Sequence, residues 1–154
     1  MPKMPKELPP FTTPEVVLAS PPFVRQETRT DCGVAVISML AKLDYWDVRM
    51  HAEQFKVRGR GMDPWCLQHT LESVGCDSSW QYSVTTPPRV KNLLYKKKFD
   101  LPTGVIITDE PDATWGHWIV VWRRTVYDPS LAAPVGVTSY PARECFALCW
   151  FTLQ

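Results

Sequence analysis

The first third of the chain contains its longest apolar run, and this pattern predicts a buried helix. Residues 33–41 are apolar except for one serine. A segment that is apolar on nearly every side is typical of a helix packed within a core, here predicted over residues 33–43. Asp31 stands just before it and is a natural N-cap, because a carboxylate can accept the free N–H groups of a first helical turn.

Two further helices are predicted by apolar residues that recur three or four positions apart. The apolar positions of the second are Val48, Ala52 and Phe55. Asp47 is its candidate cap. The third begins at Asp63-Pro64, where proline suits a first turn, and ends at Gly75, a residue that commonly stops helices. The core positions of the third are Leu67, Leu71 and Val74.

The second half of the chain changes to short runs rich in β-branched and aromatic residues, which are typical of strands. We expect strands at residues 80–84, 104–108, 117–122, 125–127 and 146–153, with one short helix within 87–98. Helices first and strands later predict an α+β fold, in which a sheet packs against a helical half.

The N-terminal segment has a different composition from the rest. Residues 1–22 hold seven of the fifteen prolines. Such a segment favours extended conformations and cannot build a core. We therefore divide the chain into an arm, residues 1–22, and a domain, residues 23–154. The arm is a candidate binding segment for protein partners in a larger assembly.

Length, charge and cysteine usage narrow the functional classes. The chain has 154 residues and a formal net charge of +1, which argues against a nucleic-acid protein held by bulk charge. No apolar run approaches the roughly 20 residues that span a bilayer, and the N-terminus lacks the apolar centre of a secretory signal. Five cysteines without regular spacing favour a reducing compartment such as the cytoplasm.

Cys32 is the first candidate for chemistry, because it stands at the start of the predicted buried helix. Helix N-termini carry partial positive charge and free N–H groups, and both stabilise a thiolate, the nucleophilic form of cysteine. The neighbouring Gly33 leaves room for a substrate to approach. Taken alone, a cysteine on an apolar helix is more often a small buried residue than a nucleophile.

A thiolate nucleophile needs a base, and the base needs an orienting group. His117 precedes a predicted strand, and Asp128 follows the next one. If Arg123-Arg124 joins these strands as an antiparallel pair, the imidazole and the carboxylate lie side by side. Gln26, six residues before Cys32, could donate its side-chain amide to an oxyanion, together with the Cys32 backbone N–H. Each of these residues alone also has an ordinary structural explanation.

Taken together, these motifs resemble those of the C39 peptidases, a family of papain-like cysteine peptidases. The run from Gln26 to Ala35, QETRTDCGVA, is similar to the family's nucleophile motif. GHWIVV from Gly116 and VYDP from Val126 resemble its His and Asp motifs. The segments from Gly61 to Gly75 and from Leu101 to Thr108 also fit. The resemblance covers about residues 23–152.

The resemblance implies a papain-like fold and a peptidase in which Cys32 is the nucleophile, His117 the general base and acid, Asp128 the orienting residue and Gln26 the oxyanion donor. It implies a peptide or protein substrate. The chain has no membrane-spanning segment and no nucleotide-binding loop like those of transporter-fused relatives, so their double-glycine specificity is not carried over. Stand-alone C39-like domains also occur in bacteriophages, so a further expectation is that this chain is a component of a virus particle. The alternative function is an adaptor that keeps the fold for binding.

Several other features have weaker claims on function. The acidic residues at positions 109, 110 and 112 could favour a basic substrate residue, and Trp115 could shield the imidazole. Cys66 with His69, and Cys145 with Cys149, lack standard zinc-finger spacing, so we expect no metal and no cofactor. The basic residues Lys91, Lys96, Lys97, Lys98, Arg123 and Arg124 could contact an acidic partner or a phosphate backbone. Most such runs are solvated surface.

Overall fold

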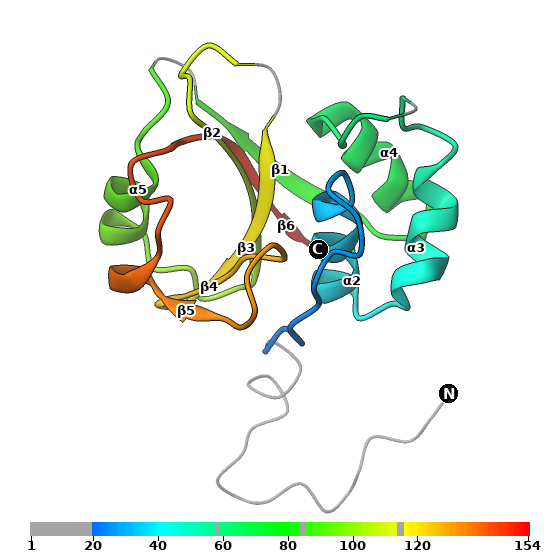
Figure 1. Cartoon of the computed structure of the whole chain (residues 1–154), viewed down its shortest axis with the longest axis horizontal. Coiled ribbons are helices and arrows are strands. Elements are labelled where there is room, and N and C mark those ends of the chain that lie inside the picture. Colours follow the sequence, from blue (N-terminus) through cyan, green and yellow to red (C-terminus); the bar gives the residue numbers. More distant parts are fainter. Residues whose placement is uncertain (1–19, 58, 84–85, 114–115) are drawn as a thin grey trace, which may run out of the picture.

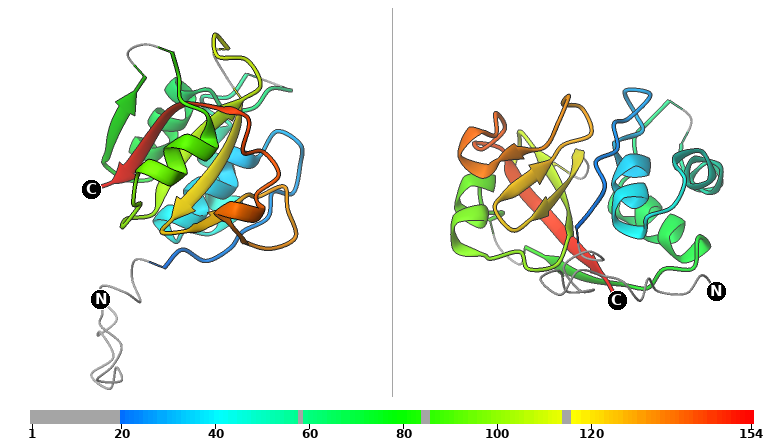
Figure 2. Two further views of the ribbon diagram at one scale, coloured as in Figure 1. Left: turned by 90° about the vertical axis from the view of Figure 1, so that its left-hand side faces the viewer. Right: turned by 90° about the horizontal axis from the view of Figure 1, so that it is seen from below.

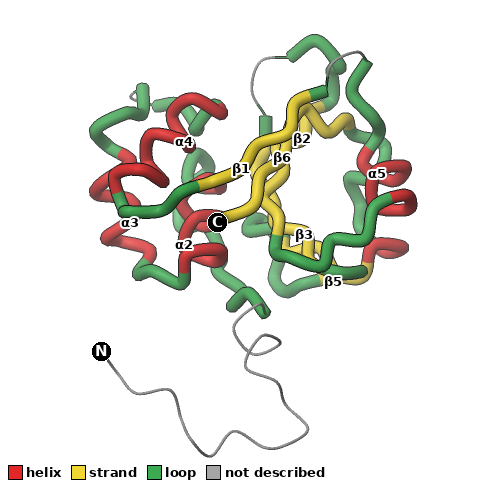
Figure 3. The backbone as a smooth tube through the Cα atoms, turned by 180° about the vertical axis from the view of Figure 1, so that it is seen from behind, coloured by secondary structure: helices red, strands yellow, loops and turns green. Residues whose placement is uncertain are grey.

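The computed structural model describes residues 20–57, 59–83, 86–113 and 116–154. Three helices come first and lie together on one side of the molecule (Figures 1 and 3). They are α2 (Cys32–Ala41), α3 (Tyr45–Ala52) and α4 (Pro64–Ser73). Most of the predicted arm, and Trp115, lie outside the described residues. Of the arm's last three residues, Pro21 is buried.

The rest of the chain forms one antiparallel sheet with a helix on its outer side. The elements are β1 (Ser78–Tyr82), α5 (Val90–Lys96), β2 (Thr103–Thr108), β3 (His117–Trp122), β4 (Thr125–Tyr127), β5 (Val135–Gly136), the 3₁₀ helix η1 (Val137–Ser139) and β6 (Phe146–Leu153). The strand order is β1-β6-β2-β3-β4-β5, and every neighbouring pair is antiparallel. The predicted α+β class is confirmed.

The two faces of this sheet bury two different apolar clusters. Because side chains alternate along a strand, Ile106 and Trp118 face α2, whereas Val105 and Ile119 face α5. The views in Figure 2 show α5 and the three N-terminal helices on opposite sides of the sheet. β3 is covered on both faces of the sheet, so its side chains are buried whichever way they point. This explains why its residues from Trp118 to Trp122 are all apolar.

The helix starts differ from the sequence-based expectations in two places. α3 begins at Tyr45, and the Asp44 side chain caps it by accepting the N–H groups of residues 46 and 47, so Asp47 is not the cap. Asp31 occupies the N-cap position of α2, yet its side chain makes no cap hydrogen bond. Its carboxylate is instead committed to other partners, described below. By contrast, the third helix begins at Pro64 as predicted, and the Asp63 side chain caps it by accepting the Cys66 N–H.

Several predicted boundaries also shift. The first strand lies at 78–82 rather than 80–84, and the helix predicted within 87–98 covers residues 90–96. The short elements β5 and η1 were not expected, because two or three residues carry no periodicity to detect. None of the described helices is long and apolar enough to cross a membrane.

Candidate active site

Cys32 lies where the helical half meets the sheet. It is the first residue of α2 and is 5% exposed, and its Sγ accepts the backbone N–H of Trp118 in β3 at 3.4 Å. The helix start is closely packed: a Cβ on Gly33 would lie 2.7 Å from the Met62 Sδ. The Met62 carbonyl in turn accepts the indole N–H of Trp118. These contacts fix the sulfur against the beginning of β3.

The hairpin of β3 and β4 brings His117 and Asp128 together, as predicted. A two-residue connection joins the strands, and His117 Nε2 lies 2.6 Å from Asp128 Oδ1. The start of β3 is tightly constrained as well, since a Cβ on Gly116 would overlap the Ile107 carbonyl oxygen. The sheet therefore fixes the backbone beside His117, and the Asp128 carboxylate fixes one nitrogen of its imidazole.

The Asp128 carboxylate is buried, with 4% of the residue exposed, and is satisfied by neutral donors as well as by the imidazole. Oδ1 accepts both the backbone N–H and the hydroxyl of Ser130, at 2.9 and 2.7 Å. Oδ2 accepts the Tyr140 hydroxyl at 2.7 Å. A carboxylate with this many donors stays ionised, because each hydrogen bond favours the charged form.

The charges of this group support one another. Burial disfavours the charged form of His117, but hydrogen bonds to Asp128 and Cys32 outweigh it and raise the imidazole pKa to about 10. Burial likewise opposes ionisation of Asp128, whereas His117, Ser130 and Tyr140 lower its pKa to about 2. His117 thus combines a 2.6 Å bond to Asp128 with a favourable interaction with Cys32, whose Sγ accepts the backbone N–H of the next residue, Trp118. A protonated imidazole beside a sulfur favours the thiolate.

Gln26 lies near this group, but its side chain is not directed as predicted. Its backbone N–H donates to the Pro129 carbonyl at 3.1 Å, which ties the segment before Cys32 to the residue after Asp128. The side-chain Nε2, however, donates to the Thr28 carbonyl at 2.9 Å, and Oε1 is buried without a hydrogen-bond partner. The structure therefore brings Cys32, His117 and Asp128 together, with the Gln26 amide engaged elsewhere.

Asp31 is a residue of this site that the motif did not explain. It is 1% exposed and sits beside the nucleophile candidate. Its carboxylate accepts the Tyr45 hydroxyl at 2.8 Å and the Lys56 ammonium at 3.1 Å, with Arg49 Nε at 3.5 Å. Burial opposes its ionisation, but Tyr45 and Lys56 outweigh this and lower its pKa. The cluster fastens the segment before Cys32 to α3 and to the chain that follows it.

Sequence reasoning also missed Tyr140, Ser130 and Lys56. Ser130 stands two residues after Asp128, a spacing at which a hydroxyl and a backbone N–H often bond a carboxylate, so this contact had a local signal. Tyr140 and Lys56 lie 12 and 25 residues from their partners. No local pattern in the sequence identifies those two contacts.

A groove adjoins the nucleophile segment on the helical side. Its volume is about 260 Å³, and Phe55, Val57, Arg60, Trp65 and Cys66 are among its lining residues. Lys56 Nζ donates to the Thr30 carbonyl, and Gly61 lies against the same carbonyl. The groove therefore lies beside the segment that precedes Cys32, and its apolar side chains could contact a side chain of a bound peptide.

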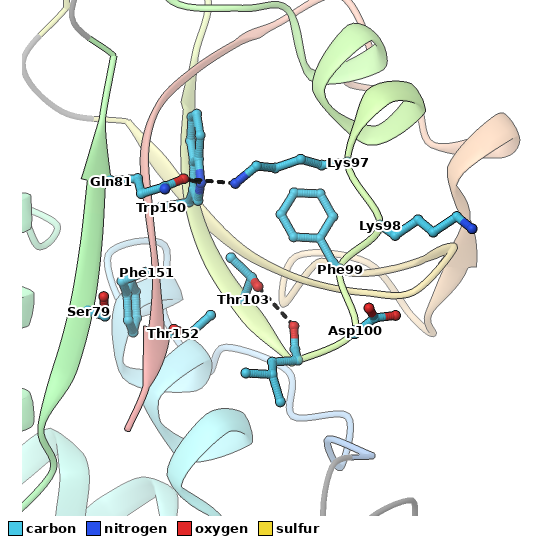
Figure 4. Close-up of a pocket in the computed structure, with 11 residues that line it drawn as sticks. Ser79, Gln81, Lys97, Lys98, Phe99, Asp100, Thr103, Trp150, Phe151 and Thr152 are labelled. Atoms are coloured by element: carbon cyan, nitrogen blue, oxygen red, sulfur yellow. Dashed lines mark hydrogen bonds between the residues drawn. The ribbon is translucent and has the colours of Figure 1, made fainter.

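A second pocket lies far from this chemistry. It has a volume of about 350 Å³ and is formed by β1, β6, the start of β2 and the segment after α5 (Figure 4). In it, Lys97 Nζ and Trp150 Nε1 both donate to Gln81 Oε1 at 2.8 Å. Thr103 in its wall pairs with Val121, at the opposite end of β2 and β3 from His117. The pocket does not contribute to the Cys32 group.

The remaining candidates do not converge on a site. Among the described residues, no group of three or more His, Cys, Asp or Glu side chains is arranged to hold a metal ion. Cys66 and Cys149 are buried, and burial raises their thiol pKa values to about 11 and about 12. Asp109 contacts the Cys145 thiol at 3.4 Å rather than the imidazole.

Comparisons with known proteins identify the fold. No protein-family profile matches the chain, and no curated protein matches its sequence. Solved structures, however, resemble the chain in fold. The peptidase domain of Streptococcus ComA, a bi-functional ABC transporter involved in a quorum sensing pathway, has a TM-score of 0.58 at 15% identity, over 85% of this chain and 96% of that one.

Two further solved structures agree. A double glycine motif protease from an AMS/PCAT transporter, in complex with the leader peptide, has a TM-score of 0.58 at 16% identity, over 88% of this chain and 91% of that one. The peptidase domain of Streptococcus mutans ComA has a TM-score of 0.55 at 16% identity, over 86% of this chain and 98% of that one. The chain therefore has the α+β, papain-like fold of C39 peptidase domains. These neighbours do not bear on a virus particle, which stays a prediction.

Proposed function

We propose that this chain, which has the fold of C39 peptidase domains, is a cysteine peptidase that hydrolyses a peptide bond. The observation that carries the proposal is that β3 holds two contacts at adjacent residues: His117 Nε2 lies 2.6 Å from Asp128 Oδ1, and the Trp118 backbone N–H donates to the Cys32 sulfur. A low-identity fold match alone would not support activity. The side chains add a nucleophile, a proton carrier and a buried anion in the order that the chemistry needs.

The proposed reaction proceeds through an acyl-enzyme. The Cys32 thiolate attacks the peptide carbonyl carbon, and the His117 imidazolium gives its proton to the leaving amine as the C–N bond breaks. The product is a thioester on Cys32 and a neutral imidazole. A water molecule then attacks the thioester, His117 takes its proton, and the carboxylic acid leaves as the thiolate and imidazolium are restored. Asp128 keeps the imidazole oriented throughout.

The first proposed donor to the developing oxyanion is the backbone N–H of Cys32, because it belongs to the first turn of α2 and first-turn N–H groups lack helical partners. The second proposed donor, Gln26 Nε2, must leave the Thr28 carbonyl before it can serve. In its present position Oε1 has no hydrogen-bond partner, so this rotation gives up the Nε2 bond to Thr28 and no bond of Oε1.

The test is alkylation of the native protein by iodoacetamide between pH 4 and 9, with mass mapping of each cysteine. We expect Cys32 to react at pH 6 at least tenfold faster than Cys66 and Cys149, whose pKa values burial raises. His117→Ala should remove this advantage. Cleavage of a fluorogenic peptide library should be lost in Cys32→Ser.

Labelling of Cys32 no faster than that of the other thiols would reject the peptidase. The adaptor would then be the better proposal, and the Gln26 contact with Thr28 is the observation that favours it. An enzyme with rapid Cys32 labelling but no peptide turnover would retain the thiolate chemistry and direct the search to other acyl donors.

A further inference from the structure

We propose that the outer side of the sheet carries a binding site for a phosphate ester, in the groove between α5 and η1. The groove has a volume of about 260 Å³. Its cationic lining residues are Lys91, Arg124 and Arg143, which come from three separate segments of the chain. Figures 1 and 2 show α5 beside the orange segment that contains η1, on the side of the sheet away from α2.

The charge in this groove is only partly neutralised by the protein, because Glu144 is the one carboxylate that the described residues pair with its cations. None of the described residues that line it is acidic. The carboxylate beside it, Glu144, is shared between Arg89 at 3.4 Å and Lys91 at 2.8 Å. Within the described part of the chain, neither Arg124 nor Arg143 has an acidic side chain within ion-pair distance. Like charges gathered in one hollow repel one another, and a bound anion removes that cost.

The backbone beneath the two arginines is fixed rather than loose. The Arg124 carbonyl accepts the Val137 N–H at 3.1 Å, and the Arg143 carbonyl accepts the Lys91 N–H at 2.9 Å. These bonds hold the segments around both arginines next to η1 and α5. Both arginines therefore line the groove from anchored backbone positions on separate segments, so that two guanidinium groups are available to one anion.

The hairpin turn that carries Arg124 is unusual for its position. Two residues, Arg123 and Arg124, connect β3 to β4, and Arg123 has a φ of 56°. Two-residue hairpin turns favour asparagine and glycine, because a left-handed conformation is costly for other side chains. Two arginines at such a turn depart from what local structure favours, and departures of this kind are expected at functional sites.

The other lining residues indicate the chemistry of the ligand. Guanidinium forks match the oxygens of a phosphate, and Asn92 and Thr138 add neutral donors. Tyr95 is 86% exposed at the rim of the groove. An exposed ring among cations is suited to stacking on a base. A nucleotide therefore fits best, either free or as one unit of a single strand.

This site is independent of the peptidase proposal. The groove lies over the cluster that contains Val90 and Ile119, whereas Cys32 belongs to the cluster on the other face of the sheet. The near-zero net charge of the chain does not exclude it, because the cations are concentrated locally. A ligand here can bind without entering the Cys32 site, so the two proposals succeed or fail separately.

The test is isothermal titration calorimetry of the whole chain with adenosine monophosphate, inorganic phosphate and a short single-stranded oligonucleotide. We expect one saturable site for the monophosphate. Arg124→Gln and Arg143→Gln should each weaken it about tenfold or more. Arg25→Gln, which removes an exposed arginine outside the groove, should not. Tyr95→Leu should weaken the nucleotide and leave inorganic phosphate unchanged. Equal Cys32 labelling and equal thermal midpoints verify that the variants fold.

Other results of the titrations would reassign or overturn the phosphate site. Binding of the oligonucleotide alone, lost in Arg124→Gln and Arg143→Gln, would assign the phosphate to a strand. No binding of any probe would overturn the proposal. Equal weakening by Arg25→Gln would also overturn it, because that result indicates general attraction of charge. Equally tight binding of polyglutamate would overturn it as well, because that result indicates an acidic peptide site.

Discussion

Two buried carboxylates support the candidate site from opposite sides, and they do so differently. Asp31 precedes Cys32 and binds the helical half, whereas Asp128 follows β4 and binds within the sheet half. Each accepts a tyrosine hydroxyl, from Tyr45 at 2.8 Å and from Tyr140 at 2.7 Å. Their charged partners differ, since Asp31 pairs with Lys56 and Asp128 with His117.

This difference separates a structural ion cluster from a chemical one. Lys56 fixes the chain around Cys32 in place through its bonds to Asp31 and Thr30. His117 can lose its proton, and Cys32 is among the groups that raise its pKa. We infer that the Asp31 cluster contributes mainly to stability and the Asp128 cluster mainly to reactivity. The following variants test that division, beginning with the largest expected effect.

Asp128→Ala should lower the rate of peptide hydrolysis by on the order of 10²–10⁴-fold, because the imidazole loses both its orientation and the anion that keeps it protonated. Stopped assays with the best fluorogenic peptide, together with Cys32 alkylation at pH 6, measure the loss. A variant that unfolds is recognised by circular dichroism. Unchanged alkylation in a folded variant would show that Asp128 does not act through His117.

Asp31→Ala should lower the free energy of unfolding by about 3–5 kcal/mol, since it leaves the Lys56 ammonium, whose side chain is 8% exposed, without its partner. Urea denaturation measures the change. Asp47→Ala, which removes an exposed carboxylate from the same helical half, is the matched control and should stay within about 0.5 kcal/mol. A loss below 1 kcal/mol for Asp31→Ala would contradict a structural role for this cluster.

The two clusters should also differ in their response to alkaline pH. The raised pKa of His117 stabilises the folded state fully below its unfolded value near 6.5, and that contribution declines as the pH rises toward 10. The lowered pKa of Asp128 contributes above its ordinary 3.8 and is lost as the pH falls toward 2. Between pH 6 and 9, the stability cost of Asp128→Ala should therefore shrink.

The Asp31 cluster contains no histidine, so the cost of Asp31→Ala should be the same at pH 6 and pH 9. On acidification, by contrast, both variants should approach the wild type, because both carboxylates have lowered pKa values. Urea midpoints at pH 6 and 9 for the two variants make the comparison. Equal shifts in both would remove the distinction between the clusters.

The smallest effects are expected for the two tyrosines. Tyr45→Phe and Tyr140→Phe each delete one hydrogen bond to a buried carboxylate, which should cost about 1–3 kcal/mol. Only Tyr140→Phe should also reduce Cys32 alkylation, through Asp128 and His117. A reduction by Tyr45→Phe of the same size would mean that the Asp31 cluster tunes reactivity as well.

The sequence predicted the sheet-side half of the candidate site because its contacts are local. His117 and Asp128 are 11 residues apart on two strands of a hairpin, so the pairing of adjacent strands suffices to bring them together. The helix start at Cys32 was predicted within one residue for a similar reason, since a long apolar run with a polar break before it defines a helix start.

The helical side was harder to predict because its contacts are distant. Asp31 has the residue type and position of a cap, and only the return of the chain at Lys56 reveals that its carboxylate serves another purpose. The Gln26 amide likewise bonds the Thr28 carbonyl, a contact that no periodic pattern in the sequence indicates. Neither the strand order nor the position of β1 follows from periodicity, which specifies elements and not their neighbours.

The place of β6 in the sheet has a consequence for the synthesis of the protein. β6 follows the other five strands along the chain, yet it lies between β1 and β2. Until residues 146–153 have left the ribosome, β1 lacks its neighbour and β2 has an open edge, whereas all residues of α2 and of the β3–β4 hairpin have been synthesised. The complete sheet can therefore assemble only late, through contacts between residues distant in the sequence. Such contacts form slowly, and strand edges stay exposed in the meantime. A nascent chain stalled before β6 would be expected to recruit chaperones.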